Sequence, residues 1–316
     1  MYQPVADPPS RLARYRRVAP SAAVFVSPIQ LDGMSIGGNF IDTANSYQNG
    51  RFEEIIGKWM EARQNRDEIV LATKYTSQWQ QHNPAIKSQA TLVGNSYKSV
   101  YTSLEGSLRK LRTSYMDILY VHFRDYSTPI EEMVNGLHTL VGFGNVLCLG
   151  ISDAPAWVVS EANRYAKDHG KTHFVIYQGL WNVFTRDIER DIIPMCRAHG
   201  MAIAPWNLLL QGTIRTDEEE EARRNAGVKG RARFTTSWER DESEKKICKV
   251  LEKIANELGA KNLRSVANAY VMQKTTHVFP ILGVKSVEQL EANVDAPNIA
   301  LTPEHTTEIE SVLPWN

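Results

Sequence analysis

The sequence lacks the features of several protein classes. It contains no apolar run of about 18 residues, which argues against a membrane-spanning helix. It has no net charge, because 36 basic residues balance 36 acidic ones, so we expect no strong attraction to nucleic acid or to an anionic membrane. The basic N-terminal stretch has no apolar segment behind it, so we do not expect it to be a secretory signal.

Cysteine is scarce as well. The three cysteines, Cys148, Cys196 and Cys248, show no metal-ligand spacing, and we expect no metal. Three thiols cannot all pair, which favours a reducing compartment. The composition, 42% hydrophobic and 23% charged, is ordinary for a globular protein. A cytoplasmic enzyme is therefore the first expectation.

Short apolar runs alternate with amphipathic segments along most of the chain. The runs expected to be buried strands are 40–41, 69–73, 116–121, 146–151, 174–177, 201–205 and 277–281. Residues 22–31 are expected to form a strand pair or one strand bent at Pro28. The segments with helical spacing are 51–64, 95–112, 129–143, 155–169, 187–199, 242–258, 265–273 and 286–294. This α/β alternation predicts one (β/α)₈ barrel domain over residues 1–316. A doubly wound sheet is the alternative, but no G-x-G-x-x-G follows the early strands.

Three segments depart from the alternation. Residues 1–20 are proline-rich and basic, and we expect a loose arm. Only residues 32–38 lie between Leu31, where one apolar run ends, and Asn39, which directly precedes the next run. That is too few for the usual crossover between parallel strands, so the first βα unit is expected to be incomplete. Residues 213–246 carry an acidic run followed by basic residues, which is typical of a long solvated loop or a lid.

Reactive side chains follow three successive strands. Asp42 ends the first of them and Tyr47 comes five residues later, while Lys74 and His122 end the next two. Because consecutive strand ends lie side by side around one rim of a barrel, these four groups are expected to converge. An ammonium beside a phenol favours release of the phenolic proton, and a carboxylate would hold the ammonium in place.

Such a set would donate a proton to a carbonyl that receives a hydride, an effect typically worth roughly 10²–10⁴-fold in rate. The alternative is a structural role for each group. Asp42 would then cap a turn or helix against which Tyr47 packs, Lys74 would form a structural ion pair, and His122 would cap its strand.

Longer segments carry a family resemblance. They are NFIDTANSYQNG (39–50), ATKY (72–75), DILYVHFRD (117–125), LGISDAPAWVV (149–159), YQGLWNVFTRDIERDIIPMCRAHGMAIAPWN (177–207) and VFPILGVKSVEQLEANV (278–294). With these segments the chain resembles the aldo-keto reductase superfamily, and most of all its fungal aryl-alcohol dehydrogenase and norsolorinic acid reductase branch. The resemblance implies a (β/α)₈ barrel that binds NADPH without a Rossmann domain.

The resemblance also implies roles for single residues. Asp42, Tyr47, Lys74 and His122 match the family's catalytic tetrad, with Tyr47 as the proton donor. Further matches are Ser152, Asp153 and Gln178, at positions that hold the nicotinamide amide, and Trp206, at the position of the aromatic that stacks on the nicotinamide ring.

Two segments are expected to bind the rest of the cofactor. Residues 207–212, with Asn207, Leu208, Leu210 and Gly212, follow a strand and could bring backbone close to a pyrophosphate. Residues 283–293 place Lys285 at a helix start, which suits a 2′-phosphate and favours NADP over NAD. Gln289 and Asn293 share a helix face that could meet adenine, and Gly283 begins the segment. The alternative for 283–293 is an ordinary capped helix.

The substrate side departs from the family pattern. Phe123 and Arg124 follow His122 where this branch commonly has two tryptophans, so Arg124 is expected to alter the substrate pocket. The first expectation is NADPH-dependent reduction of an aldehyde or ketone to the alcohol, with an aryl or polycyclic carbonyl compound of secondary metabolism as substrate. The alternatives are non-redox acid–base chemistry, such as isomerisation or dehydration, and a non-catalytic binding subunit. The expected partner is a small-molecule carbonyl compound, without nucleic acid or membrane, and a homodimer stays open.

Overall fold

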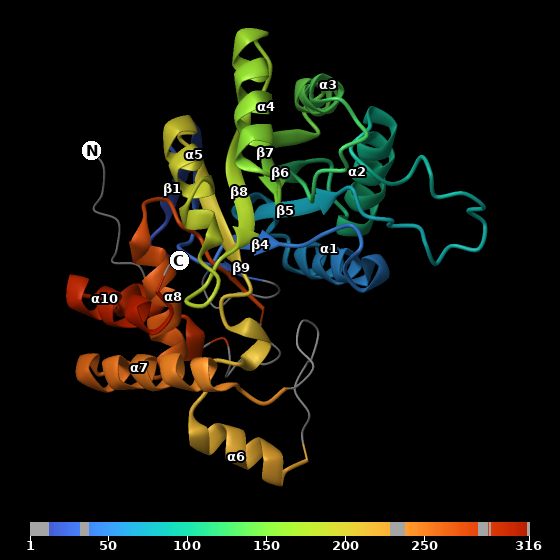
Figure 1. Cartoon of the computed structure of the whole chain (residues 1–316). Helices are drawn as coiled ribbons and strands as arrows, with labels where there is room; N and C mark the ends of the chain where they lie inside the picture. Colours follow the sequence, from blue (N-terminus) through green and yellow to red (C-terminus); the bar gives the residue numbers. More distant parts are fainter. Residues whose placement is uncertain (1–12, 32–37, 228–237, 284–289, 291, 315–316) are drawn as a thin grey trace, which may run out of the picture.

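A computed structural model describes residues 13–31, 38–227, 238–283, 290 and 292–314 of the chain. Parallel strands lie at its centre, and helices lie around them (Figure 1). The strands are β1 (Arg16–Ala19), β2 (Ala22–Val26), β3 (Gln30–Leu31), β4 (Phe40–Asp42), β5 (Val70–Tyr75), β6 (Met116–Val121), β7 (Val146–Ser152), β8 (Phe174–Leu180), β9 (Ala202–Trp206) and β10 (Ile281–Leu282).

Eight of these strands form one sheet in the order β10-β3-β4-β5-β6-β7-β8-β9, with parallel neighbours throughout. Val278, shortly before β10, forms a parallel bridge with Ile203 of β9, while β10 itself pairs with β3. The segment around β10 therefore contacts both ends of the sheet and closes the barrel. The predicted (β/α)₈ class is confirmed.

The helices are α1 (Arg51–Arg63), α2 (Tyr97–Leu111), α3 (Ile130–Gly142), α4 (Ala156–Asp168), α5 (Ile192–His199), α6 (Asp217–Asn225), α7 (Glu242–Leu258), α8 (Leu263–Lys274) and α10 (Pro303–Val312). The sequence pattern predicted α1 to α5, α7 and α8 to within a few residues, but it did not predict α6 or α10. Most of the helix expected at 286–294 lies outside the described residues. No helix in the described part of the chain is long and apolar enough to cross a membrane.

Two apolar layers follow from the period of two along each strand. Alternate side chains such as Phe40, Ala72, Ile118 and Ile176 point into the barrel and form one cluster. Their neighbours along the strands, such as Ile41, Leu71 and Leu119, point outward and pack under the helices. The inner cluster also contains Val18, Ala19 and Val26 from the β1–β2 hairpin, which is how the hairpin is attached to the barrel.

This hairpin corrects the expectation of a loose arm over residues 1–20. Residues 16–19 form β1, and Val18 and Ala19 are fully buried. Arg16 donates from Nη2 to the carbonyl oxygen of Val278 at 2.8 Å, and its guanidinium lies 4.8 Å from the centroid of the Phe279 ring. Residues 1–12 lie outside the described part of the chain.

The link between β3 and β4 is short, as the sequence indicates. Leu31 pairs with Ile41, and residues 32–39 alone connect the two strands. Eight residues are too few for the crossover helix that usually joins adjacent parallel strands. The first βα unit is therefore incomplete because too few residues connect the paired strands β3 and β4.

The segment 213–246 is more ordered than the predicted loop or lid. It contains α6, which begins with a capping box: Thr216 Oγ1 accepts from the Glu219 amide, and the Glu219 carboxylate accepts from the Thr216 amide. Helix α7 begins within it as well, at Glu242. Residues 228–237, between the two helices, are not among those described.

Candidate active site

The predicted site residues occupy inward positions at the carboxyl ends of the strands. On β4 and β5 the inward series runs from Phe40 to Asp42 and from Ala72 to Lys74. Side chains alternate along a strand, so Asp42 and Lys74 point to the same face as the apolar residues two positions before them. That face is the inside of the barrel, and the polar residue at the strand end lies at the barrel mouth. Ser152, Gln178 and Trp206 hold the same place on β7, β8 and β9.

Three of the four tetrad residues meet at the ammonium of Lys74. Its Nζ atom lies 2.5 Å from Asp42 Oδ2 and donates to Tyr47 Oη at 3.3 Å and to the carbonyl oxygen of Thr43 at 2.8 Å. The side chain of Lys74 is fully buried and that of Asp42 is 3% exposed. Lys74 therefore has three oxygen partners, one of them the phenol.

The charge state of Lys74 follows from these contacts. Burial alone would lower the pKa of the ammonium, but Asp42 and the Tyr47 oxygen outweigh burial, and the pKa of Lys74 is raised above its ordinary value. Lys74 is consequently a cation at neutral pH. A phenol oxygen that accepts a hydrogen bond from this cation can still donate its own proton to another oxygen.

His122, the fourth residue of the tetrad, lies beside the phenol. Its ring and that of Tyr47 lie edge to face with centroids 5.9 Å apart, and its Nδ1 is 3.4 Å from Ser77 Oγ. Burial, and then the charge of Lys74, lower the pKa of His122 to about 3. The imidazole is therefore neutral at physiological pH, so it can orient a carbonyl oxygen without competing as an acid.

A neutral His122 gives a direct prediction. We expect its Cε1 proton resonance to show no titration between about pH 5 and 8, whereas an unperturbed histidine titrates near 6.5. The measurement is a one-dimensional proton NMR titration, with the resonance assigned by its loss in His122→Gln. A midpoint near 6.5 for this resonance would contradict the low pKa.

The residues expected at the nicotinamide lie next to the tetrad. Gln178 Nε2 donates to Asp42 Oδ1 at 3.0 Å, which links the two groups directly. Trp206 Nε1 donates to Asp153 Oδ1 at 3.2 Å, and Ser152 Oγ donates to Asp153 Oδ2 at 3.4 Å. Asp153 has a φ of 43°, an unusual conformation for a residue with a side chain. The structure thus places all four residues at one rim.

The loop expected at the pyrophosphate has an unusual backbone. Asn207, Leu210, Gln211 and Gly212 have φ values of 60°, 44°, 56° and 99°. Positive φ is costly for a residue such as Leu210, and strained backbone of this kind clusters at ligand-binding sites. The side chain of Leu208 is buried and anchors the loop to the core.

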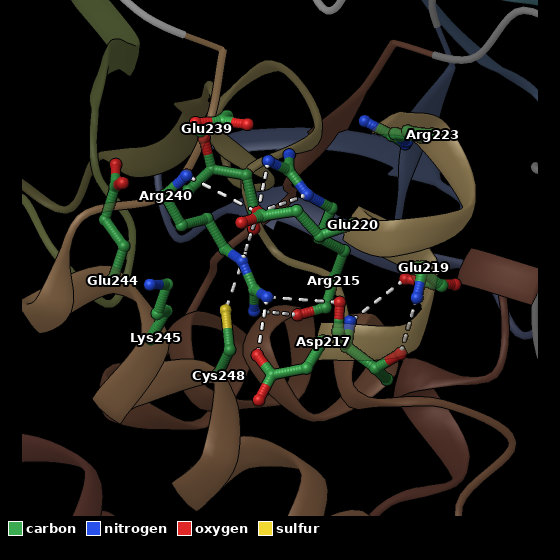
Figure 2. Close-up of polar contacts among 12 residues, drawn as sticks. Arg215, Asp217, Glu219, Glu220, Arg223, Glu239, Arg240, Glu244, Lys245 and Cys248 are labelled. Atoms are coloured by element: carbon green, nitrogen blue, oxygen red, sulfur yellow. Dashed lines mark hydrogen bonds and ion pairs between the residues drawn. The ribbon is translucent and has the colours of Figure 1, made fainter. Parts of the chain in front are cut away.

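A buried ion cluster, which sequence reasoning missed, supports this loop (Figure 2). Arg215 and Arg240 both donate to the Oε2 atom of Glu220, and Arg215 Nη1 also donates to the carbonyl oxygen of Gly212 at 2.7 Å. Burial alone would raise the pKa of Glu220, but hydrogen bonds from Arg240 and Arg215 lower it overall. Segment 213–246, whose charges suggest a solvated loop, therefore contains a buried ion network, and that network holds Gly212 through Arg215.

The second cofactor segment is described only in part. Lys285 and Gln289 lie outside the described residues. Gly283 is exposed just after β10, and Asn293 is buried. The expected contacts of this segment with a 2′-phosphate and adenine therefore remain predictions.

On the substrate side, Phe123 and Arg124 differ in their surroundings. Phe123 is 39% exposed beside His122, with ring centroids 5.9 Å apart. Arg124 is turned into its own loop: its Nη1 donates to Asn95 and Asp125, and its Nη2 donates to the carbonyl oxygen of Thr128. Its side chain is only 7% exposed. We expected Arg124 to contact the substrate. Its contacts instead favour a role in holding the loop in place.

Tyr126 is a residue that the sequence reasoning did not single out. It is 65% exposed and follows Arg124 in the same loop after β6. Tyr126 could have been predicted as a site residue from its position, two residues after Arg124 and four after His122. Together, Phe123 and Tyr126 give this loop two exposed aromatic rings.

Comparison with known proteins finds a family model and relatives that match most of the chain. The model of the family described as "Aldo/keto reductase family" matches residues 32–314. Aryl-alcohol dehydrogenase [NADP(+)] of Phanerodontia chrysosporium is 51% identical, with 100% of this chain and 90% of that protein covered. Norsolorinic acid reductase B of Dothistroma septosporum is 47% identical over 96% of this chain and 82% of that protein.

A putative aryl-alcohol dehydrogenase of Saccharomyces cerevisiae is 43% identical, with 100% of this chain and 91% of that protein covered. The alignment with the Phanerodontia protein spans 346 positions, 30 more than the 316 residues of this chain. That relative therefore has residues with no counterpart in this chain.

Proposed function

We propose a function on one premise: the chain belongs to the aldo/keto reductase family, whose model matches it over residues 32–314. As a member of that family it is an oxidoreductase. The proposed reaction reduces an aryl or polycyclic aldehyde or ketone to the alcohol. Bound NADPH would supply the hydride for the carbonyl carbon, and Tyr47 donates the proton to the carbonyl oxygen.

The observation that carries the proposal is the meeting of Asp42, Tyr47 and Lys74 at one buried ammonium. As Tyr47 gives up its proton, negative charge develops on its oxygen. Lys74, 3.3 Å away, stabilises that charge where water does not compete, and Asp42 keeps the ammonium in place. The neutral ring of His122 lies beside the phenol, where it can orient the same carbonyl oxygen.

The residues present fit an NADP cofactor. Ser152, Asp153 and Gln178 bring polar groups to the rim next to Asp42, and Trp206 offers an aromatic face there. The strained backbone at Leu210–Gly212 is the kind of feature that surrounds a bound ligand. A relative that is 51% identical is named as using NADP(+). Lys285 is the cation that we propose for the 2′-phosphate.

The substrate class rests on a separate observation. Phe123 and Tyr126 present aromatic rings on the loop that follows His122. Aromatic rings prefer offset or edge-to-face contact with other aromatic rings, which suits an aryl substrate. The relatives are named for aryl alcohols and for norsolorinic acid, and this agrees with an aromatic carbonyl compound.

A reducing compartment such as the cytoplasm suits the three cysteines, which are all unpaired thiols in the structure. We propose no macromolecular partner for the reaction itself, because the protein groups assigned to it, Asp42, Tyr47, Lys74 and His122, belong to one chain. A homodimer would be compatible with this arrangement.

The test is turnover of NADPH with an aromatic aldehyde, followed by the loss of reduced-nicotinamide absorbance. We expect carbonyl reduction with NADPH and at least about tenfold lower kcat/KM with NADH, since only NADPH carries the group that Lys285 is proposed to bind. Binding of NADPH is measured in parallel by fluorescence. NADPH binding without reduction of any carbonyl compound would favour non-redox chemistry, and absence of binding would favour a non-catalytic subunit.

A further inference from the structure

Another buried ion pair, apart from those described above, contacts the segment that carries Tyr47. Lys110, near the end of α2, has its Nζ atom 2.5 Å from Glu53 Oε2 of α1. The Glu53 side chain is fully buried and that of Lys110 is 17% exposed. Burying such a pair incurs a desolvation cost that its attraction often only just offsets. Neither residue is among those assigned to the tetrad or the cofactor, so the pair has another role.

The contacts of this pair lead to the tetrad from two sides. Lys110 Nζ also donates to the carbonyl oxygen of Asn45 at 3.2 Å, two residues before Tyr47. Glu53 Oε1 accepts from Thr73 Oγ1 at 2.7 Å, and Thr73 directly precedes Lys74. The Glu53–Lys110 pair is thus hydrogen-bonded to Asn45, close to the proton donor Tyr47, and to Thr73, next to Lys74.

Asn45 is held through both its side chain and its backbone, although its Oδ1 atom has no hydrogen-bond partner among the described residues. Its side-chain amide donates to Ser103 Oγ of α2 at 2.8 Å, and its backbone amide donates to the carbonyl oxygen of Lys74 at 3.0 Å. With the bond from Lys110, Asn45 joins β5, α2 and the Tyr47 loop. Asn45, Glu53, Ser103 and Lys110 are called the positioning cluster below.

The turn after Tyr47 needs such support. Gln48, Asn49 and Gly50 have φ values of 47°, 61° and 85°, three consecutive residues in the left-handed region. This conformation persists only where the surroundings enforce it. Helices α1 and α2 lie close enough together to provide this support. A Cβ atom on Gly57 of α1 would lie only 2.3 Å from the carbonyl oxygen of Lys110 in α2.

We propose that the positioning cluster, with the Glu53–Lys110 pair at its centre, holds the Tyr47 loop so that the phenol stays within reach of Lys74. This inference rests on the proposed function, because it assigns the cluster to placement of the proton donor. Within the described part of the chain, charged and titratable groups close to the phenol include Asp42 from β4, Lys74 from β5 and His122 after β6. The cluster acts on the phenol only through the loop.

The test compares Lys110→Met with a matched control. We expect kcat for carbonyl reduction to fall by about 10–100-fold in Lys110→Met, with KM and the NADPH dissociation constant changed by no more than about twofold. Arg112→Met is the control, since Arg112 pairs with Glu61 across the same two helices but on the exposed surface. This control is expected to keep wild-type kcat.

A second readout does not depend on turnover. Phenolate absorbance is titrated in each variant and in its Tyr47→Phe counterpart, and the difference isolates the Tyr47 phenol. Separation of the phenol from Lys74 is expected to move this titration to higher pH in Lys110→Met. Ser103→Ala changes no charge and keeps the ion pair, so a smaller shift in the same direction would show that position, rather than the lost charge of Lys110, is responsible.

Wild-type kcat together with an unshifted phenol titration in both Lys110→Met and Ser103→Ala would overturn the positioning role. If Lys110→Met does not fold, Ser103→Ala decides alone by the same two measurements. A wild-type protein that reduces no carbonyl compound would instead refute the proposed function. The phenol titration would still report on the positioning cluster in that case.

Discussion

Tyr47→Phe is expected to lower kcat for carbonyl reduction by roughly 10²–10⁴-fold, the usual worth of general acid catalysis. The substitution removes one oxygen atom, and with it the group that accepts from Lys74 at 3.3 Å and supplies the proton. Affinity for NADPH is expected to change by no more than about twofold, because the ring itself remains. The measurements are steady-state kinetics and fluorescence titration with NADPH.

The chain offers a matched control for this variant. Tyr75 directly follows Lys74 on β5, but its side chain is outward and fully buried under the helices. Its hydroxyl has no hydrogen-bond partner among the described residues, so Tyr75→Phe removes a buried hydroxyl at little cost. Tyr75→Phe should keep wild-type kcat. Reduction at the wild-type rate by Tyr47→Phe would mean that another group donates the proton.

Strand alternation, which places Lys74 inward and Tyr75 outward, also shows how much of the site the sequence can predict. Strand alternation and the rule that sites lie at the carboxyl ends of barrel strands were sufficient to bring Asp42 and Lys74 together. The structure places their side chains 2.5 Å apart. The prediction needed only local patterns, because neighbouring parallel strands fix which residues lie side by side.

Contacts between distant segments could not be predicted in this way. Arg215 and Arg240 share Glu220, although 25 residues separate the two arginines, and their run of charges has the composition of a solvated loop. Arg124 likewise bonds to Asn95, 29 residues earlier. Nothing local distinguishes an arginine that faces substrate from one that ties two loops together.

Strand β1 was missed for a related reason. Residues 16–19 have little apolar character in their first half, and they form a strand because β2 pairs with them and the barrel core buries Val18 and Ala19. Strand preference depends on the partner and on burial more than on the residues themselves. The incomplete first βα unit was predictable because chain length alone limits what residues 32–39 can form.

The second large effect is expected for Lys74→Met, in stability as well as in activity. Methionine nearly matches the length of lysine but leaves Asp42 buried without its cation, with the bond from Gln178 among its remaining contacts. Breaking a buried pair in this way typically costs about 3–5 kcal/mol. We expect urea unfolding to show this loss in the free energy of unfolding, and kcat to fall by about 10²–10⁴-fold as the phenol loses its neighbouring charge.

The double variant Asp42→Asn/Lys74→Met separates the two effects. A neutral amide at position 42 removes the uncompensated charge, so most of the lost free energy of unfolding should return, while activity should stay as low as in Lys74→Met. Recovery of both stability and activity would show that the ammonium acts only by balancing Asp42. Recovery of stability alone would assign to Lys74 the chemical role that its contact with Tyr47 indicates. The folded double variant keeps the phenol, His122 and the rim residues, and it lacks the Lys74–Asp42 ion pair.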